Sequence, residues 1–232
     1  MPELICTKAV SQAFISEWEG EGIKLGIYPF IQTRPLPFYI NLEETPDIWV
    51  FTSSRAVDAI KVYLKKYFLA ILRSKKIVAI GHKTADTLGA MGYPIAARGD
   101  NALALVEEIN EQFYPQEVLH FCGDRRRDEL SKMLEILGFY LKEKIVYQTI
   151  LTPQKVDWGQ AEGALFFSPS AVSSYLKANT WPVGKIAFAI GPTTHAALED
   201  AGIEPAYTAP EPNPEALLQT VLAINDISLN YP

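Results

Sequence analysis

Short apolar runs recur along the chain, and each ends in a polar or glycine turn that is followed by a segment with helical spacing. Val57, Ile60 and Leu64 illustrate that spacing after one such run. Bounded apolar runs rich in β-branched and aromatic residues are typical of buried parallel strands. The runs are LIC (4–6), IWVFT (48–52), IVAIG (77–81), VLHFCG (118–123), ALFFS (164–168) and IAFAIG (186–191). Their alternation with helices predicts an α/β fold with parallel sheets and helices on both faces.

Residues that commonly begin or end helices flank several of these segments. Asn101 and Asn213 precede helical segments as N-caps do, and Pro214 then occupies a first helical position. Gly138 and Gly202 follow helical segments, where glycine ends many helices. The pattern therefore predicts both the helices and several of their boundaries.

The sequence also repeats itself at an offset of 110 to 116 residues. The matched pairs keep their order along the chain, which predicts two copies of one unit, residues 1–116 and 117–232. The pairs are Cys6 and Cys122, Gly22 and Gly138, Gln32 and Gln148, Ser53 and Ser168, Gly81 and Gly191, and Asn101 and Asn213.

Two extended, proline-bearing stretches interrupt the alternation, at residues 26–37 and 144–153. They occupy equivalent positions of the two copies, and we interpret them as interdomain connectors. Either each copy forms one domain, or the chain crosses over at both connectors and one domain contains both chain ends. Composition does not separate these two arrangements.

Composition fits a globular protein of one large or two small domains, with 232 residues, 48% apolar and 21% charged. The net charge of −6 argues against a generally basic nucleic-acid binder, although residues 51–83 carry eight Lys or Arg and one acid. No apolar run approaches the ~20 residues of a membrane helix, and we see no secretory signal. We expect a cytoplasmic protein that binds neither nucleic acid nor membrane.

Cysteine and histidine are sparse. Two cysteines, Cys6 and Cys122, are too few for a disulfide framework and indicate a reducing compartment. His82, His120 and His195 are scattered without the spacing of metal ligands. We therefore expect no metal site.

The ends of the predicted strands are rich in hydroxyl groups. Ligands of open parallel sheets bind there, against helix N-termini whose free N–H groups hold anions. Ordinary N-capping is the alternative reading for each Ser or Thr, but four such turns at corresponding places predict an anion site with several contacts. The turns are Thr52-Ser53-Ser54, Lys83-Thr84, Ser168-Pro169-Ser170 and Pro192-Thr193-Thr194.

Cations lie near the same positions. Arg125, Arg126 and Arg127 follow another strand, and one or two of them could reach a carboxylate or phosphate. Arg55 and Lys83 fall in the first turn of their helices, where the helix dipole disfavours a positive charge. That placement favours a ligand-binding role for both.

Several common catalytic motifs are absent from the sequence. It contains no GxGxxG after a strand, no GxxxxGK[ST] and no GxSxG. A triad of Ser168, His195 and an acid is disfavoured because His195 lies within a helical pattern. An enzyme with this sequence would work mainly by holding a reactive, polyanionic substrate.

Taken together, the motifs resemble the uroporphyrinogen-III synthase family of tetrapyrrole, porphyrin and heme biosynthesis. They span nearly the whole chain, in the order found in that family. The motifs are FTSSRAV (51–57), IVAIGHKTADTL (77–88), GDNALAL (99–105), FCGDRRRDEL (121–130), VYQT (146–149), FFSPSAV (166–172) and AIGPTTHAALEDAG (189–202).

The resemblance implies two flavodoxin-like α/β domains joined by a two-stranded antiparallel linker, and it selects the crossover arrangement. One domain would contain residues 1–30 and 155–232, and the other residues 36–145. The linker strands would be residues 31–35 and 146–154. Cys6 and Cys122 would then lie in different domains, which disfavours a disulfide between them.

The resemblance also implies the reaction: hydroxymethylbilane is cyclised to uroporphyrinogen III, in the cleft between the domains, with inversion of ring D and loss of water. The family needs no metal or cofactor, and its substrate carries eight carboxylates. Tyr147 of VYQT is the implied proton donor to the leaving hydroxyl, because a phenol beside a carboxylate-rich ligand stays protonated at pH 7. A packed linker aromatic is its alternative role.

The remaining implied site residues would bind carboxylates or order the turns. They are Ser53, Arg55, Lys83, Thr84, Asn101, Arg127, Ser168, Thr193 and Thr194. Lys83 departs from some members, in which a small neutral residue precedes the threonine. The implied enzyme is a monomer with transient contact to hydroxymethylbilane synthase. The alternatives are a non-catalytic tetrapyrrole-binding relative and another two-domain protein that binds small anions.

Overall fold

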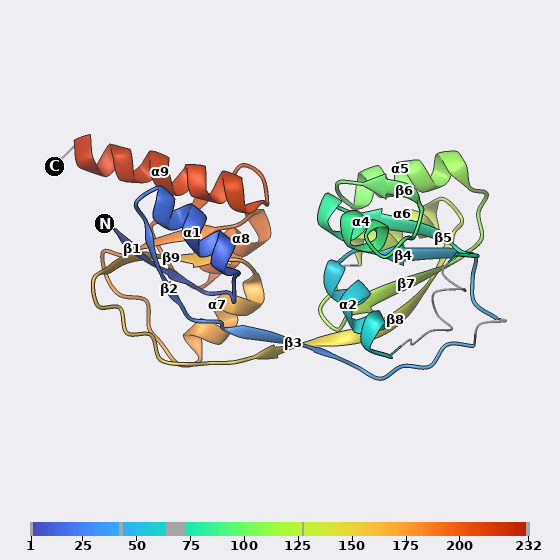
Figure 1. Ribbon diagram of the computed structural model, residues 1–232, viewed down its shortest axis with the longest axis horizontal. Coiled ribbons are helices and arrows are strands. Elements are labelled where there is room, and N and C mark those ends of the chain that lie inside the picture. Colours follow the sequence, from blue (N-terminus) through green and yellow to red (C-terminus); the bar gives the residue numbers. More distant parts are fainter. Residues whose placement is uncertain (1, 42–43, 64–72, 127, 231–232) are drawn as a thin grey trace. The chain divides into compact units, whose positions relative to one another are not determined.

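The structure is a computed structural model that describes residues 2–41, 44–63, 73–126 and 128–230 (Figure 1). Its internal contacts divide the chain into two compact units. The terminal unit combines Met1–Gln32 with Ile150–Pro232, and the central unit is Thr33–Thr149.

The terminal unit is built on a five-stranded sheet in the order β11-β10-β9-β1-β2. Its neighbouring strands pair in parallel, including β1 with β9, a pairing that joins the two ends of the chain in one sheet. Its strands are β1 (Glu3–Cys6), β2 (Lys24–Ile27), β9 (Ala161–Phe166), β10 (Ile186–Ala189) and β11 (Ala206–Thr208). Its helices are α1 (Gln12–Gly20), α7 (Pro169–Leu176), α8 (Pro192–Asp200) and α9 (Pro214–Asn230).

The central unit has a six-stranded sheet in the order β3-β8-β7-β4-β5-β6. The five strands from β8 to β6 pair in parallel. The strands are β3 (Ile31–Pro35), β4 (Ile48–Phe51), β5 (Lys76–Ile80), β6 (Ile95–Gly99), β7 (Glu117–Gly123) and β8 (Tyr140–Leu151). The helices described are α2 (Ser54–Tyr63), α4 (His82–Gly89), α5 (Ala102–Gln112) and α6 (Glu129–Ile136).

Both faces of each sheet are covered, as the apolar runs predict. Alternate residues of β4 point to opposite faces: Trp49 and Phe51 pack with α2 and α4, whereas Ile48 and Val50 pack with α5 and α6. In the terminal unit, α7 and α8 cover one face and α1 and α9 the other. The predicted α/β class with parallel sheets is confirmed.

The predicted duplication has a structural counterpart. Five strands of the central sheet lie in the order β6-β5-β4-β7-β8. The terminal sheet has the corresponding order β11-β10-β9-β1-β2. Cys6 in β1 and Cys122 in β7 therefore occupy matching strands. Each unit takes its strands from both sequence copies.

The second connector differs from its predicted form. We expected a linker strand at residues 146–154, but β8 already begins at Tyr140 and pairs with β7 as far as Tyr147. The same strand continues beside β3. Leu36 N–H donates to the Val146 carbonyl and Thr152 N–H to the Phe30 carbonyl, so the residue numbers run in opposite directions and β3 and β8 are antiparallel. The connector strand is thus an extension of a strand of the central sheet.

Helix ends follow the predicted caps. Oδ1 of Asn101 accepts from Ala104 N–H at 3.0 Å, and Oδ1 of Asn213 accepts from Ala216 N–H at 2.7 Å. Gly138 and Gly202 follow α6 and α8 with φ of 82° and 66°, in the left-handed region that glycine adopts readily. Among the described residues, no helix is both long and apolar enough to cross a membrane.

Candidate active site

Most predicted site residues lie where parallel strands end. Ser53 follows β4, Lys83 and Thr84 begin the helix after β5, and Asn101 follows β6. Because β4, β5 and β6 are neighbours in one parallel sheet, these residues share its carboxyl-end edge. Ser168, Thr193 and Thr194 occupy the equivalent edge of the terminal unit, after β9 and β10.

Three of these side chains cap helices. The Ser53 hydroxyl oxygen accepts from Arg55 N–H at 3.2 Å, and that of Ser168 accepts from Ala171 N–H at 3.2 Å. Asn101 caps α5 in the same way. The capping reading is therefore confirmed for all three. A capping hydroxyl uses an oxygen lone pair, so its hydrogen can still be donated to a ligand oxygen.

The helices α4 and α8 begin differently from those capped helices. Their N-cap residues are Gly81 and Gly191, a matched pair of the duplication, and neither helix has a side-chain cap among the described residues. Backbone N–H groups at such an end can bind an anion. Lys83 and Thr193 are exposed in these first turns.

The side chains of Thr84 and Thr194 are buried in the first turns of α4 and α8. They are 5% and 2% exposed. Arg55 is half-buried in the first turn of α2. Arg127 lies outside the described residues.

Tyr147 lies directly against the backbone of Gly123. The two residues are partners in the β7–β8 pairing, and a Cβ added to Gly123 would lie 2.5 Å from Cε2 and Cζ of the tyrosine ring. Only glycine leaves room for the ring there. Tyr147 is 9% exposed and packs in the cluster that contains Phe51 and Phe121.

A β-bulge sets the direction of the Tyr147 side chain. The register shifts between Cys122 and Gly123, so that Cys122 pairs with Ile145 but Gly123 pairs with Tyr147. A one-residue slip moves a side chain to the opposite face of a sheet, and bulges often re-aim side chains beside functional sites. Without the bulge, Tyr147 would share a face with Glu143 rather than with Phe121.

A buried polar cluster lies on the other face of the same strands. His120 Nε2 is 3.0 Å from the Thr52 hydroxyl, and Nδ1 is 3.9 Å from Glu143 Oε1. The second carboxylate oxygen of Glu143 forms an ion pair with Arg126. Sequence reasoning missed this cluster: alternation within β7 indicates that His120 and Cys122 share a face, but it does not show that Glu143 lies beside them.

Burial and charge shift the protonation of these groups. Burial lowers the pKa of His120 to about 4, so its imidazole is neutral at pH 7. Burial, reinforced by the Glu143 carboxylate, raises the pKa of Cys122 to about 11. The hydrogen bond from Arg126 lowers the pKa of Glu143 below its usual value. At pH 7 the charges of Arg126 and Glu143 thus offset each other beside a neutral thiol and a neutral imidazole.

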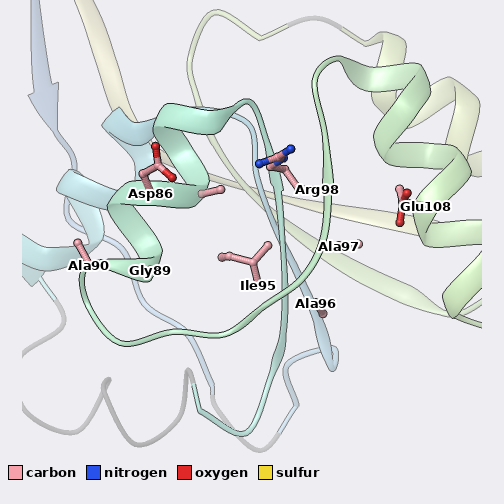
Figure 2. A pocket seen from close by; sticks show the side chains of 9 residues that line it. Asp86, Gly89, Ala90, Ile95, Ala96, Ala97, Arg98 and Glu108 are labelled. Atoms are coloured by element: carbon pink, nitrogen blue, oxygen red, sulfur yellow. The ribbon is translucent and has the colours of Figure 1, made fainter.

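A hollow of about 600 Å³ lies elsewhere in the central unit, between α4, β6 and α5 (Figure 2). Ile95 and Arg98 line it from β6, Asp86 from α4 and Glu108 from α5. It contains none of the predicted site residues. Because Arg98 also contacts His82 at 3.0 Å and acids lie on both sides, this hollow offers no concentrated positive charge for a polyanion.

Two α/β units with predominantly parallel sheets share a duplicated strand order, and each has at its sheet edge a helix that begins without a side-chain cap among the described residues, which defines a two-unit α/β protein. The chain belongs to the uroporphyrinogen-III synthase family, because the family model described as "Uroporphyrinogen-III synthase HemD" matches residues 12–219. The predicted family and enzyme class are thereby confirmed.

Individual relatives agree with that assignment. The chain is 27% identical to a uroporphyrinogen-III synthase of Saccharomyces cerevisiae, over 80% of this chain and 78% of the relative. It is 28% identical to that of Schizosaccharomyces pombe, over 80% and 79%. Among solved structures, the uroporphyrinogen-III synthetase of Helicobacter pylori 26695 gives a TM-score of 0.74 at 21% identity, over 97% of this chain and 100% of that one. A mutant uroporphyrinogen III synthase of Thermus thermophilus gives 0.63 at 17%, over 97% and 99%. At these identities the structural matches establish the fold.

Proposed function

We propose that this chain converts hydroxymethylbilane to uroporphyrinogen III, closing the macrocycle with inversion of ring D and loss of water. The observation that carries the proposal is the family match over residues 12–219, together with the FTSSRAV and FFSPSAV motifs at the ends of parallel strands and the VYQT motif within β8. We also propose that residues 1–32 with 150–232, and 33–149, act as its two domains.

The strand-end groups would bind the carboxylates of the substrate. The helices that follow Gly81 and Gly191 offer backbone N–H groups, and the hydroxyls of Ser53 and Ser168 can donate hydrogen bonds while they cap their helices. Because such groups lie in both units, we propose that both contribute contacts to one substrate molecule. Binding of this kind fixes the reacting rings close together, which lowers the entropic part of the barrier.

Tyr147 would donate the proton to the leaving hydroxyl. Support comes from its place near the carboxyl end of the central sheet and from the glycine and the bulge that orient its ring. Departure of water leaves a cationic azafulvene, which bound carboxylates and fixed dipoles stabilise. Lys83 and Arg55 would hold the peripheral carboxylates in place, since both carry positive charge in first helical turns.

The decisive experiment mixes the purified protein with freshly prepared hydroxymethylbilane and assigns the porphyrin isomers after oxidation. The proposal predicts the type III isomer, formed faster than the type I isomer that arises by spontaneous closure. Type I product alone, at the rate seen with heat-denatured protein, would refute synthase activity and leave a binding protein.

Variants then assign the roles. Tyr147→Phe should lower turnover by ~10²–10⁴-fold, as expected for loss of a proton donor, and more than Thr84→Ala or Thr194→Ala. The matched control is Tyr93→Phe, since Tyr93 is buried in the same core cluster and its hydroxyl has no partner among the described residues. Unchanged turnover in Tyr147→Phe would assign Tyr147 to packing.

Ser168 offers a separation of capping from substrate binding. Glycine is nearly as good an N-cap as serine, whereas alanine costs about 1 kcal/mol. Ser168→Gly should therefore keep the stability of the protein and still raise KM, because it lacks the hydroxyl. An unchanged KM in Ser168→Gly would leave this serine with capping alone.

The proposal includes a monomeric, cytoplasmic enzyme that receives its substrate from hydroxymethylbilane synthase. Sedimentation of the protein alone measures its oligomeric state, and sedimentation with that synthase measures their contact. A stable dimer of the protein alone would refute the monomeric state.

A further inference from the structure

A compact set of three metal-ligand atoms is buried in the central unit, on the sheet face opposite Tyr147. His120 and Cys122 alternate on β7, and Glu143 is the register partner of His120 on β8, so the three side chains point to the same side. The nearest ligand atoms of His120, Cys122 and Glu143 all lie within 4.8 Å of one another.

One of these ligand atoms makes no hydrogen bond within the part of the chain that the structure describes. His120 is 2% exposed, and its Nδ1 has no hydrogen-bond partner among the described residues. A buried polar atom without a partner costs free energy and calls for an explanation. Nδ1 faces the Glu143 carboxylate at 3.9 Å, too far for a hydrogen bond.

We propose that His120 Nδ1, Cys122 Sγ and Glu143 Oε1 form a binding site for a divalent cation of the Zn²⁺ class, and that Arg126 competes with the cation for Glu143. Imidazole nitrogen, thiolate and carboxylate are the ligands that Zn²⁺ prefers, and three protein ligands leave a fourth position for water. The site uses no group of the proposed synthase reaction, so the two proposals stand or fall separately.

Neighbouring contacts suit this role. The Thr52 hydroxyl lies 3.0 Å from Nε2 of His120 and can accept a hydrogen bond from it, which leaves Nδ1 with its lone pair for a metal. In a tetrahedral zinc site the N–O separation is about 3.4 Å. The observed 3.9 Å between Nδ1 and Oε1 therefore needs only a small movement of the partly exposed Glu143 side chain.

The exchange keeps the buried charge balanced. Without metal, the Arg126 guanidinium neutralises Glu143 and Cys122 holds its proton. When the cation binds, the thiol proton leaves to solvent and the guanidinium leaves the carboxylate. The two positive charges of the cation then replace those of the proton and the guanidinium. The Arg126 side chain is 32% exposed, so it can turn to water.

The test is titration of the metal-free, reduced full-length protein with Co²⁺, which reports thiolate ligation through a sulfur-to-cobalt charge-transfer band. We expect the band with one Co²⁺ per chain and its loss when excess Zn²⁺ is added. Cys122→Ser should abolish the band, whereas Cys6→Ser should keep it, since Cys6 is the other buried free cysteine and lies in the terminal unit. Absence of the band from the native protein, or its loss in Cys6→Ser alone, would overturn the proposal.

Two further variants guard against loss of folding. Glu143→Gln changes a partly exposed side chain and should weaken Zn²⁺ binding by at least ~10-fold in equilibrium dialysis. Arg126→Gln removes the guanidinium that competes for Glu143 and should tighten Zn²⁺ binding by about 2–5-fold. That factor corresponds to the free energy of one solvent-exposed ion pair. Unchanged or weaker binding in Arg126→Gln, with circular dichroism like that of the native protein, would refute the competition.

Discussion

The contact between Gly123 and the Tyr147 ring predicts a strong coupling between two substitutions. In Gly123→Ala, the new Cβ would lie 2.5 Å from Cε2 and Cζ and 2.8 Å from the hydroxyl oxygen of Tyr147. Heavy atoms cannot approach so closely, so the ring or strand β7 must move. Overpacking of this kind costs about 1–3 kcal/mol.

Removing the ring reverses the sign of the effect. Tyr147→Val lacks Cε2, Cζ and the hydroxyl, so the added methyl group of Gly123→Ala then meets no ring. Alanine is preferred over glycine within a strand by about 0.5–1 kcal/mol, and Gly123→Ala should therefore stabilise the Tyr147→Val protein by that amount. The coupling free energy between the two sites should reach about 1.5–4 kcal/mol, well above the ~0.5 kcal/mol expected of independent sites.

The assay is urea unfolding of the four proteins, followed by circular dichroism, with hydrogen exchange across β7 and β8 to locate the effect. Gly163→Ala is the control, because its new Cβ would meet the Ile186 carbonyl in the terminal unit instead. That substitution should cost the same in the native protein and in the Tyr147→Val protein. An equal loss of unfolding free energy from Gly123→Ala in both backgrounds would refute the close approach. If Gly123→Ala instead lowers turnover and leaves stability unchanged, displacement of the ring alone impairs function.

Three more outcomes follow from the described contacts. Burial lowers the pKa of His120 from 6.5 to about 4, so the unfolded chain binds this proton at a higher pH than the folded protein does. The free energy of unfolding of the metal-free protein should therefore fall by up to ~1.4 kcal/mol per pH unit as the pH drops from 6.5 toward 4. In His120→Gln the urea midpoint should depend less on pH over that range. Asn213→Ala removes the cap of α9 and should cost about 1 kcal/mol in thermal or urea unfolding, whereas a cost near zero would discount the 2.7 Å bond. Cys6 and Cys122 are buried free thiols whose pKa burial raises to about 11, so an aromatic disulfide reagent should titrate both only after denaturation; rapid reaction of either in native protein would contradict their burial.

Much of the fold follows from local pattern. Apolar runs such as IWVF are buried on both sides and flanked by turns, so pattern alone locates the strand. Asn101 and Gly138 mark helix ends because capping and left-handed geometry are local properties. The pairing of β1 with β9 is different: it joins residues more than 150 positions apart, and no local signal specifies it.

The candidate site divides in the same way. The positions of Ser53 and Ser168 after strands could be predicted from the sequence, since both follow apolar runs. The direction of Tyr147 could not, because it depends on one extra residue in the β7–β8 pairing. The cluster of His120 and Glu143 depends on the register between β7 and β8, which the sequence does not display.

The pairing of β1 with β9 has a consequence for synthesis on the ribosome. The Leu165 carbonyl accepts hydrogen bonds from both the backbone and the hydroxyl of Thr7, across 158 positions of chain. At 5–20 residues per second, roughly 8–30 s pass between synthesis of these partners. The continuous segment Thr33–Thr149 is synthesised before β9, so it can fold while the edge of β1 that pairs with β9 is still unpaired. Until residues 161–166 emerge, that edge is an unpaired strand which a neighbouring nascent chain can join.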